Sequence, residues 1–356
     1  MVAGEETLRH LGPVVRHMIV GLLDEPRPVV LVCPEGSEPA HLPTPPVQVL
    51  PYRFSRLPFS HERVFADLAT SLAQAGAGLL HALDTDALPL ARRLSDATQL
   101  PYVVGVYSLP RDLHVHDQRC RMLLAASEPI RRMLVNARAA PAENIRLFRP
   151  GVYPARMATC FTEPQHSVAI VAAGELQHFV PWSAVIDAFA GLTQRQQDCA
   201  FFIIGTGRAE AALRRQAEKL HLMTGLTFVE QQAPERLTDI LRSADLFVAP
   251  DLSDRVDIEL LSAMASGTPV LACDGGNLDF INEQTAVIFP RGQAAELEAK
   301  LAAMMSDRAA ARRLAENALA HLRQEHSPAA MVQQLVDAYR SVCPARSTPS
   351  PSRPAT

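Results

Sequence analysis

The stretch Ala200-Phe201-Phe202-Ile203-Ile204-Gly205-Thr206-Gly207 is a short apolar run that ends in two glycines. A helical pattern follows it over Ala209–Leu220. A continuous apolar run of this length is typical of a strand buried on both faces, as in a parallel sheet. Because strands and helices of this kind alternate along the chain, the sequence predicts an α/β fold.

The strand patterns fall into two sets. The first set covers Val29–Cys33, Gly78–His81, Tyr102–Val106 and Met122–Ala126. The second set covers Ser167–Ala173, Ala200–Ile204, Leu226–Val229, Leu246–Pro250, Pro269–Cys273 and Ala286–Phe289. Between them, Pro150 to Gln165 holds three prolines and reads as a linker. We therefore expect two Rossmann-like, doubly wound domains facing a central cleft, at 1–157 and 158–328. A further helix is expected over 329–342, and 343–356 should be a disordered tail.

Composition excludes several classes of protein. Of 356 residues, 48% are hydrophobic and 20% are charged, which fits a folded chain rather than a disordered one. The net charge of −4 provides no general basic field for nucleic acid. We find no apolar run of about 18 residues and no signal-peptide pattern, so a cytoplasmic protein is expected. Contact with the cytoplasmic face of a membrane stays open.

Four motifs have competing interpretations. Asp84-Thr85-Asp86 and His114-Val115-His116-Asp117 have metal-like spacings, but a helix cap and a surface loop explain them better, so no metal is expected. Gly205-Thr206-Gly207-Arg208 could hold a phosphate through backbone amides or could be a tight turn. Glu210 stands where a dinucleotide fingerprint needs its third glycine. The acidic run 254–259 follows a strand end, where open α/β sheets place ligands, but could also be a solvated loop.

Five segments of the second half together resemble the family 4 retaining glycosyltransferases, which have the GT-B fold. They are Ala173-Gly174-Glu175-Leu176 with Ile186–Phe189, Phe202–Gly207, Ser243–Pro250, Ala263–Val270 and Gly275-Gly276, followed by a helix ending at Tyr339. The first domain is similar more weakly, through Gly12 in the opening loop and through Ile145–Gly151.

The resemblance implies transfer of a sugar from a nucleotide-sugar donor to a glycan or lipid-linked acceptor, with retained configuration. It implies neither a metal nor another cofactor. It also implies that the helix over 329–342 returns to pack on the first domain. The donor would lie mainly on the second domain, against Gly174, Gly205, Gly207, Ile258, Gly275 and Gly276. The acceptor would lie on the first domain, near Gly12.

The family's charged positions are replaced in this chain. Glu175 and Val180 stand where the family has the Arg and the Lys that bind diphosphate. Asp254 and Ser262 stand for its two glutamates, with Ser262 near the ribose, and Tyr107 stands for its first-domain His. Because preorganised cations stabilise a departing diphosphate, these losses should slow transfer.

Two hypotheses follow from the substitutions. The chain is either a divergent transferase that uses Asp254, Tyr107 and the two loop arginines Arg208 and Arg255, or a non-catalytic binding or partner subunit in glycan synthesis. No Arg or Lys occurs from 157 to 194. Any replacement cation for the diphosphate should therefore come from Arg208 or Arg255.

Overall fold

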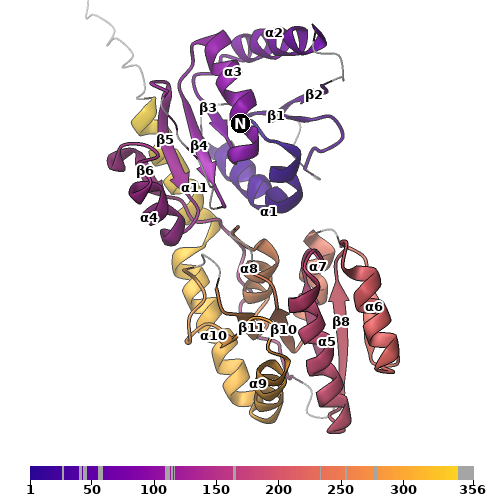
Figure 1. Ribbon diagram of the computed structural model, residues 1–356. Helices are drawn as coiled ribbons and strands as arrows, with labels where there is room; N and C mark the ends of the chain where they lie inside the picture. Colours follow the sequence, from indigo (N-terminus) through magenta and orange to yellow (C-terminus); the bar gives the residue numbers. More distant parts are fainter. Residues whose placement is uncertain are drawn as a thin grey trace, which may run out of the picture.

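The computed structural model describes the chain except for residues 26–27, 40–41, 43–45, 55–58, 109–112, 114, 116, 163–165, 233, 253–254, 276–278 and 344–356. Figure 1 shows two domains, one above the other, with helices α10 and α11 along one side. Strand β6 ends at Leu147 and β7 begins at Val168, and the two do not pair. The sheets are therefore separate. The expected tail beyond Cys343 lies outside the described residues.

The first domain is a parallel sheet with helices on its faces. Val2 pairs with both Val32 and Ala82 and so joins the pair β1-β2 to the sheet β3-β4-β5-β6. Every residue of β4 is buried, as expected for a strand covered on both sides. The elements are α1 (Glu5–Gly21), β1 (Val30–Pro34), β2 (Gln48–Tyr52), α2 (Phe59–Gln74), β3 (Leu80–Ala82), α3 (Leu88–Thr98), β4 (Tyr102–Val106), β5 (Cys120–Ala125), α4 (Glu128–Asn136) and β6 (Ile145–Leu147).

The second domain has the strand order β12-β11-β10-β7-β8-β9, and all its pairs are parallel. Renumbered from β7, this is 3-2-1-4-5-6 read from the other edge, the order of a Rossmann sheet. Its elements are β7 (Val168–Ala173), α5 (Phe179–Gln194), β8 (Cys199–Ile204), α6 (Glu210–Lys219), β9 (Leu226–Val229), α7 (Pro234–Arg242), β10 (Leu246–Ala249), α8 (Ile258–Ala265), β11 (Val270–Cys273), β12 (Val287–Phe289), α9 (Ala294–Ser306) and α10 (Arg308–Glu325).

Helix α11 (Pro328–Val342) returns to the first domain. It packs against α1 and reaches β5. The Tyr339 hydroxyl lies 2.7 Å from Nδ1 of the buried His81 on β3, and Arg340 pairs with Glu25 at 3.1 Å. The last helix therefore ties the end of the second domain to the first.

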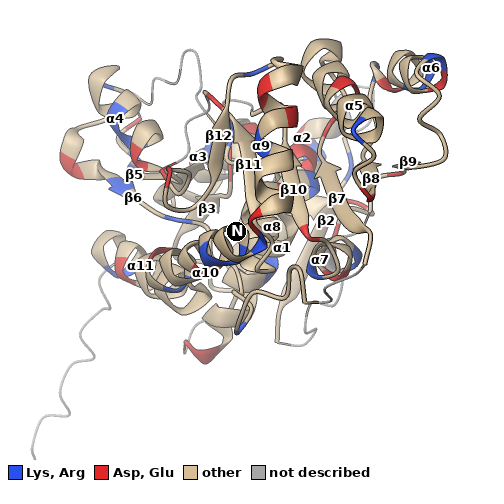
Figure 2. Ribbon diagram, turned by 90° about the horizontal axis from the view of Figure 1, so that it is seen from below, with Lys and Arg blue, Asp and Glu red and all other residues tan. Residues whose placement is uncertain are grey.

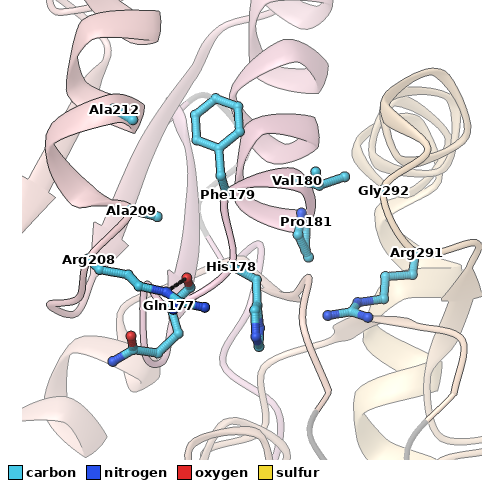
Figure 3. Close-up of a pocket in the computed structure, with 10 residues that line it drawn as sticks. All are labelled: Gln177, His178, Phe179, Val180, Pro181, Arg208, Ala209, Ala212, Arg291 and Gly292. Atoms are coloured by element: carbon cyan, nitrogen blue, oxygen red, sulfur yellow. Dashed lines mark hydrogen bonds between the residues drawn. The ribbon is translucent and has the colours of Figure 1, made fainter.

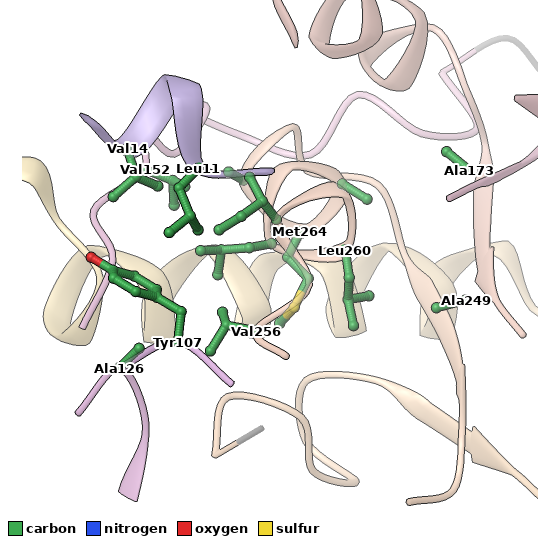
Figure 4. Close-up of a cluster of buried hydrophobic side chains, with 14 of the residues drawn as sticks. Leu11, Val14, Tyr107, Ala126, Val152, Ala173, Ala249, Val256, Leu260 and Met264 are labelled. Carbon is green, nitrogen blue, oxygen red and sulfur yellow. The ribbon is translucent and has the colours of Figure 1, made fainter. Parts of the chain in front are cut away.

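The domain junction is apolar (Figure 4). Leu11 and Val14 of α1 and Leu260 and Met264 of α8 belong to one cluster of buried side chains. Polar contacts surround this cluster. Val256 N donates to the Tyr107 carbonyl at 2.8 Å, and an Asp279 oxygen accepts from Glu128 N and from Arg149 of the first domain, at 3.0 and 3.1 Å. The interface therefore combines a hydrophobic centre with ion pairs at its edge.

Charges of both signs are interspersed over the helices seen in Figure 2. Among the described residues, none of the helices combines the length and apolar character that crossing a membrane requires.

The structure adds three elements that the strand and helix patterns did not predict, β2, β6 and α2. Strand β2 is partly exposed and contains a proline, so it lacks the continuous apolar run that marks a buried strand. Helix α2 was also missed. The expectation that Gly12 lies in a loop is wrong, because Gly12 is inside α1 and a methyl group there would meet nothing within 4 Å.

Candidate functional site

The second sheet creates a crevice at the carboxyl ends of its strands. Strands β7 and β10 are neighbours, but the helix after β7 leads to β8 and the helix after β10 leads to β11, on the opposite side. The loops after the two strands therefore diverge. In open α/β sheets, ligands bind at this switch point.

A cavity of about 670 Å³ lies among the loops at this edge (Figure 3). Its walls come from the loop after β7 with the first turn of α5, from the end of the β8–α6 connection with the first turn of α6, and from the loop after β12. The lining residues are Gln177, His178, Phe179, Val180, Pro181, Arg208, Ala209, Ala212, Arg291 and Gly292. Two arginines therefore line the cavity, and the first turn of α5 forms one of its walls.

Asp251 holds two of the cavity's polar side chains. This carboxylate follows β10 and is only 11% exposed. One of its oxygens lies 2.7 Å from His178 Nδ1, and the other accepts from the Arg291 guanidinium. Asp274, just after β11, accepts from the backbone amide of Arg291 at 2.8 Å. The ends of β10 and β11 therefore fix the position of Arg291, while the Asp251 charge offsets part of its positive field.

Arg208 is held on the opposite wall. Its Nε donates to the carbonyl of Gln177 at 2.9 Å, and Figure 3 shows this contact beside the cavity. The Arg208 residue is exposed to solvent. Arg208 thus places a second positive charge at the cavity.

Two glycines in this region allow neighbouring loops to pack closely against each other. A Cβ on Gly205 would lie 1.9 Å from the Gly174 carbonyl oxygen, and one on Gly207 would lie 2.4 Å from that of Leu176. Gly205 also has φ +150°, which other residues rarely adopt. Both glycines let the loops after β7 and β8 lie against each other, and this supports the tight-turn interpretation of the motif.

The two helix starts at this edge differ in charge. Helix α8 is capped by Asp257, whose carboxylate accepts from Leu260 N at 2.8 Å. Burial, followed by the neighbouring Glu259, raises the pKa of Asp257 to about 7. Helix α5 has no side-chain cap. The first amides of α5 therefore remain open to an anion, whereas an acidic side chain already occupies the start of α8.

Glu175 and Val180, which stand where the family has its two cations, face different parts of the structure. Val180 lines the cavity and is 67% exposed. Glu175 is not among the lining residues, and its carboxylate lies 3.4 Å from Nε2 of His10 on α1. Val180 therefore lines the cavity, whereas Glu175 faces the first domain.

Two other predicted residues lie at the domain junction. Arg255 forms an antiparallel β-bridge with Ser108 of the first domain. Burial raises the pKa of Asp84, and the positive charge of Arg255 offsets part of this increase. Tyr107 is 1% exposed, and burial raises the pKa of its hydroxyl. Because that hydroxyl stays protonated at neutral pH, Tyr107 cannot act as a general base there. Arg255 does not line the cavity, so it does not supply the expected cation in this arrangement.

The remaining predicted residues are dispersed. Ile258 is buried at the start of α8, and Ser262 lies one turn further on, half-buried. Gly275 has φ +88° after β11. Asp254 and Gly276 lie outside the described residues.

Arg291 and His178 were missed by the sequence analysis. Arg291 comes two residues after the strand predicted at Ala286–Phe289, so the rule that places ligands at strand ends could have found it. His178 gave no signal of its own, because its contact with Asp251 spans 73 residues of sequence.

Residues 163–321 match the family model described as "Glycosyl transferases group 1". A D-inositol 3-phosphate glycosyltransferase of Nocardia farcinica is 30% identical over 191 residues, 51% of this chain and 42% of that protein. One of Rhodococcus opacus is 31% identical over 146 residues, 39% of this chain and 32% of that protein. The matches thus span less than half the length of these curated relatives.

The fold is shared over nearly the whole chain. A glycosyltransferase from Rickettsia africae superposes with TM-score 0.79 and 13% identity, covering 97% of this chain and 99% of that one. Anabaena HepE, in complex with UDP and glucose, superposes with TM-score 0.74 and 16% identity, covering 96% and 99%. At these identities the likeness establishes the GT-B fold.

Proposed function

We propose that this chain, a GT-B protein whose second domain belongs to the group 1 glycosyltransferases, transfers a sugar from a nucleotide-sugar donor held in the cavity beside α5. One observation carries the proposal. Arg208, Arg291 and the uncapped start of α5 converge on one cavity at the switch point of a Rossmann sheet. Positive side chains and open backbone amides are the groups that bind a diphosphate.

The cavity also has a surface suited to a base. Phe179 is 42% exposed, and its ring points away from His178 along the wall that Ala212 completes (Figure 3). An exposed aromatic face stacks on a nucleobase with little sequence preference. In this arrangement the base packs on Phe179 and the diphosphate lies between the two arginines.

The arginines also have a part in the reaction. When the bond between the sugar and the diphosphate breaks, the bonding electrons pass to the diphosphate oxygen, and its negative charge increases. Arg208 and Arg291 stabilise that charge more in the transition state than in the ground state, which lowers the barrier. They therefore take the role of the two cations that Glu175 and Val180 cannot supply.

The stereochemistry belongs to the same proposal. The resemblance to family 4 enzymes supports transfer with retention to a hydroxyl of a glycan or lipid-linked acceptor. The family match favours this transferase over a non-catalytic subunit. Membrane contact and a partner subunit stay predictions of the sequence analysis.

Calorimetric titration with UDP, and with ADP and GDP as alternatives, tests the donor site. We expect Arg291→Gln and Arg208→Gln each to weaken binding of the preferred nucleotide about tenfold. Arg242→Gln is the matched control, since Arg242 is 56% exposed and pairs with Asp239 on α7, away from the cavity. Equal losses in all three variants, or no binding of any nucleotide, would argue against the proposal.

Sugar transfer is measured by incubating the protein with the glucose conjugate of the preferred nucleotide and analysing the products. The anomeric configuration of the product, read by proton NMR, tests retention. An inverted product would refute the retaining mechanism and leave the donor site standing.

A further inference from the structure

A second cavity, of about 660 Å³, lies in the first domain. It forms where the loops after β1, β2 and β3 meet the first turn of α1. It is thus the first-domain counterpart of the donor cavity, at the carboxyl edge of its own sheet. We call it the first-domain cavity.

Its charge is the opposite of the donor cavity's. Four carboxylates line it, those of Glu5, Glu6, Glu35 and Asp86, together with the guanidinium of Arg53, which lies 3.8 Å from Glu35. Arg9, on the next turn of α1, pairs with Glu5 at 3.1 Å and with Glu6 at 2.8 Å and offsets part of their charge. Four carboxylates with two guanidinium groups leave this wall net negative. Asp86 is fixed in place because it also accepts from the backbone amide of Thr7 at 3.0 Å. Such a wall accepts hydrogen bonds from hydroxyl groups and repels anions.

An aromatic pair forms the rest of the wall. The rings of Tyr52 and Phe54 lie 5.1 Å apart, and both residues line the cavity. Phe54 is 38% exposed and also contacts Phe65, with ring centroids 5.3 Å apart. An exposed ring held in place by its neighbours offers a flat apolar surface. Carboxylates beside a flat aromatic face complement a sugar, which has hydroxyls at its rim and C–H groups on its face.

One chain of contacts leads from this cavity to the donor loops. Glu6 lies 3.3 Å from His10 on the next turn of α1, and His10 lies 3.4 Å from Glu175 in the second domain. Glu175 is two residues before Gln177, which lines the donor cavity. The two cavities are therefore linked through α1 across the domain junction.

We propose that the first-domain cavity binds the acceptor as an uncharged sugar or polyol and excludes phosphorylated acceptors. This inference rests on the proposed transferase function. It separates the chain from the curated relatives, which are named for D-inositol 3-phosphate. A phosphate in this cavity would face a wall that stays net negative, with four carboxylates and the exposed guanidinium groups of Arg9 and Arg53, and like charges brought together across an interface oppose binding.

Matched pairs of probes that differ only in a phosphate test this acceptor class. We suggest myo-inositol with D-inositol 3-phosphate, and glucose with glucose 6-phosphate, titrated by ligand-observed NMR in low salt. In the wild-type protein, at least one uncharged member should bind about tenfold more tightly than its phosphorylated partner. Glu35→Lys should abolish this preference, and because Glu35 is 62% exposed its replacement should leave the fold intact.

Two aromatic variants locate the binding. Phe54→Ala should weaken binding of the uncharged sugar at least fivefold and leave UDP affinity unchanged. Phe179→Ala, a similarly exposed aromatic of the donor cavity, should do the reverse. The UDP titration reports on the donor site alone, so failure of the proposed function and failure of this inference are distinguishable.

Three results would overturn the acceptor assignment. They are tighter binding of the phosphorylated member in both pairs, no binding of either uncharged sugar, and uncharged-sugar binding that Phe54→Ala and Glu35→Lys leave unaltered.

Discussion

Val180→Lys should strengthen the binding of a nucleoside diphosphate about tenfold. Val180 lines the donor cavity, is 67% exposed and lies next to the loop that carries Arg291, since a Cβ on Gly292 would be 3.3 Å from Val180 Cγ1. A lysine there adds a third positive charge beside Arg208 and Arg291. It removes little buried apolar surface, so the fold should tolerate it.

The magnitude follows from Coulomb's law in a solvated site. Two unit charges about 4 Å apart interact with about 1 kcal/mol in water and about 4 kcal/mol at an effective dielectric constant near 20. Because position 180 is exposed, the interaction energy between the new lysine and one negative charge lies near the lower of these two values. A diphosphate carries more than one negative charge, which raises the energy to roughly 1.4 kcal/mol, or tenfold in Kd. A cation in the first turn of α5 costs about 0.3–1 kcal/mol of stability in the free protein through the helix dipole.

Calorimetry with UDP at about 50 mM and about 500 mM salt measures the effect. The gain should shrink at high salt, because screening acts on the charge and not on base stacking. Glu175→Arg is the matched control, since it changes the charge by two units at a residue that faces His10 rather than the cavity. We expect it to change UDP affinity less than twofold. An equal gain from both variants would show that the cavity is not the diphosphate site.

Two further predictions concern stability. Burial lowers the pKa of His81 to about 3 and of His326 to about 4, so the unfolded chain takes up protons below pH 6.5 that the folded one does not. Asp257, with its pKa raised to about 7, acts in the opposite direction. The free energy of unfolding should therefore fall on acidification from pH 6.5 to 4.5, by roughly 1 kcal/mol per pH unit. Urea titrations that give a constant or rising free energy of unfolding would contradict this. Gly205→Ala should cost more than about 2 kcal/mol, because its Cβ would overlap a backbone oxygen, whereas Gly12→Ala inside α1 should stabilise by about 0.5–1 kcal/mol. Thermal denaturation compares the two variants, and a destabilising Gly12→Ala would mean that this glycine has a role beyond the helix.

Much of the fold could be predicted because its signals are local. A buried parallel strand is apolar along its whole length, and five of the six second-domain strands show this, the exception being β9, which contains Thr227. The linker prolines and the helix patterns are equally local. Strand β2 was not predicted because it is partly exposed and lacks a continuous apolar run.

Only the tertiary structure decided which charges meet at the candidate site. In the sequence, no cation lies near Val180, and Glu175 and Val180 look like neighbours at one site. The order of strands in the second sheet brings Arg291 to Asp251 across 40 residues and to the same cavity as Val180, while Glu175 faces the other domain. Hydrophobic periodicity indicates most of the strands and helices one at a time. The order in which strands pair, and therefore which strand ends share a crevice, depends on contacts between segments far apart in the chain.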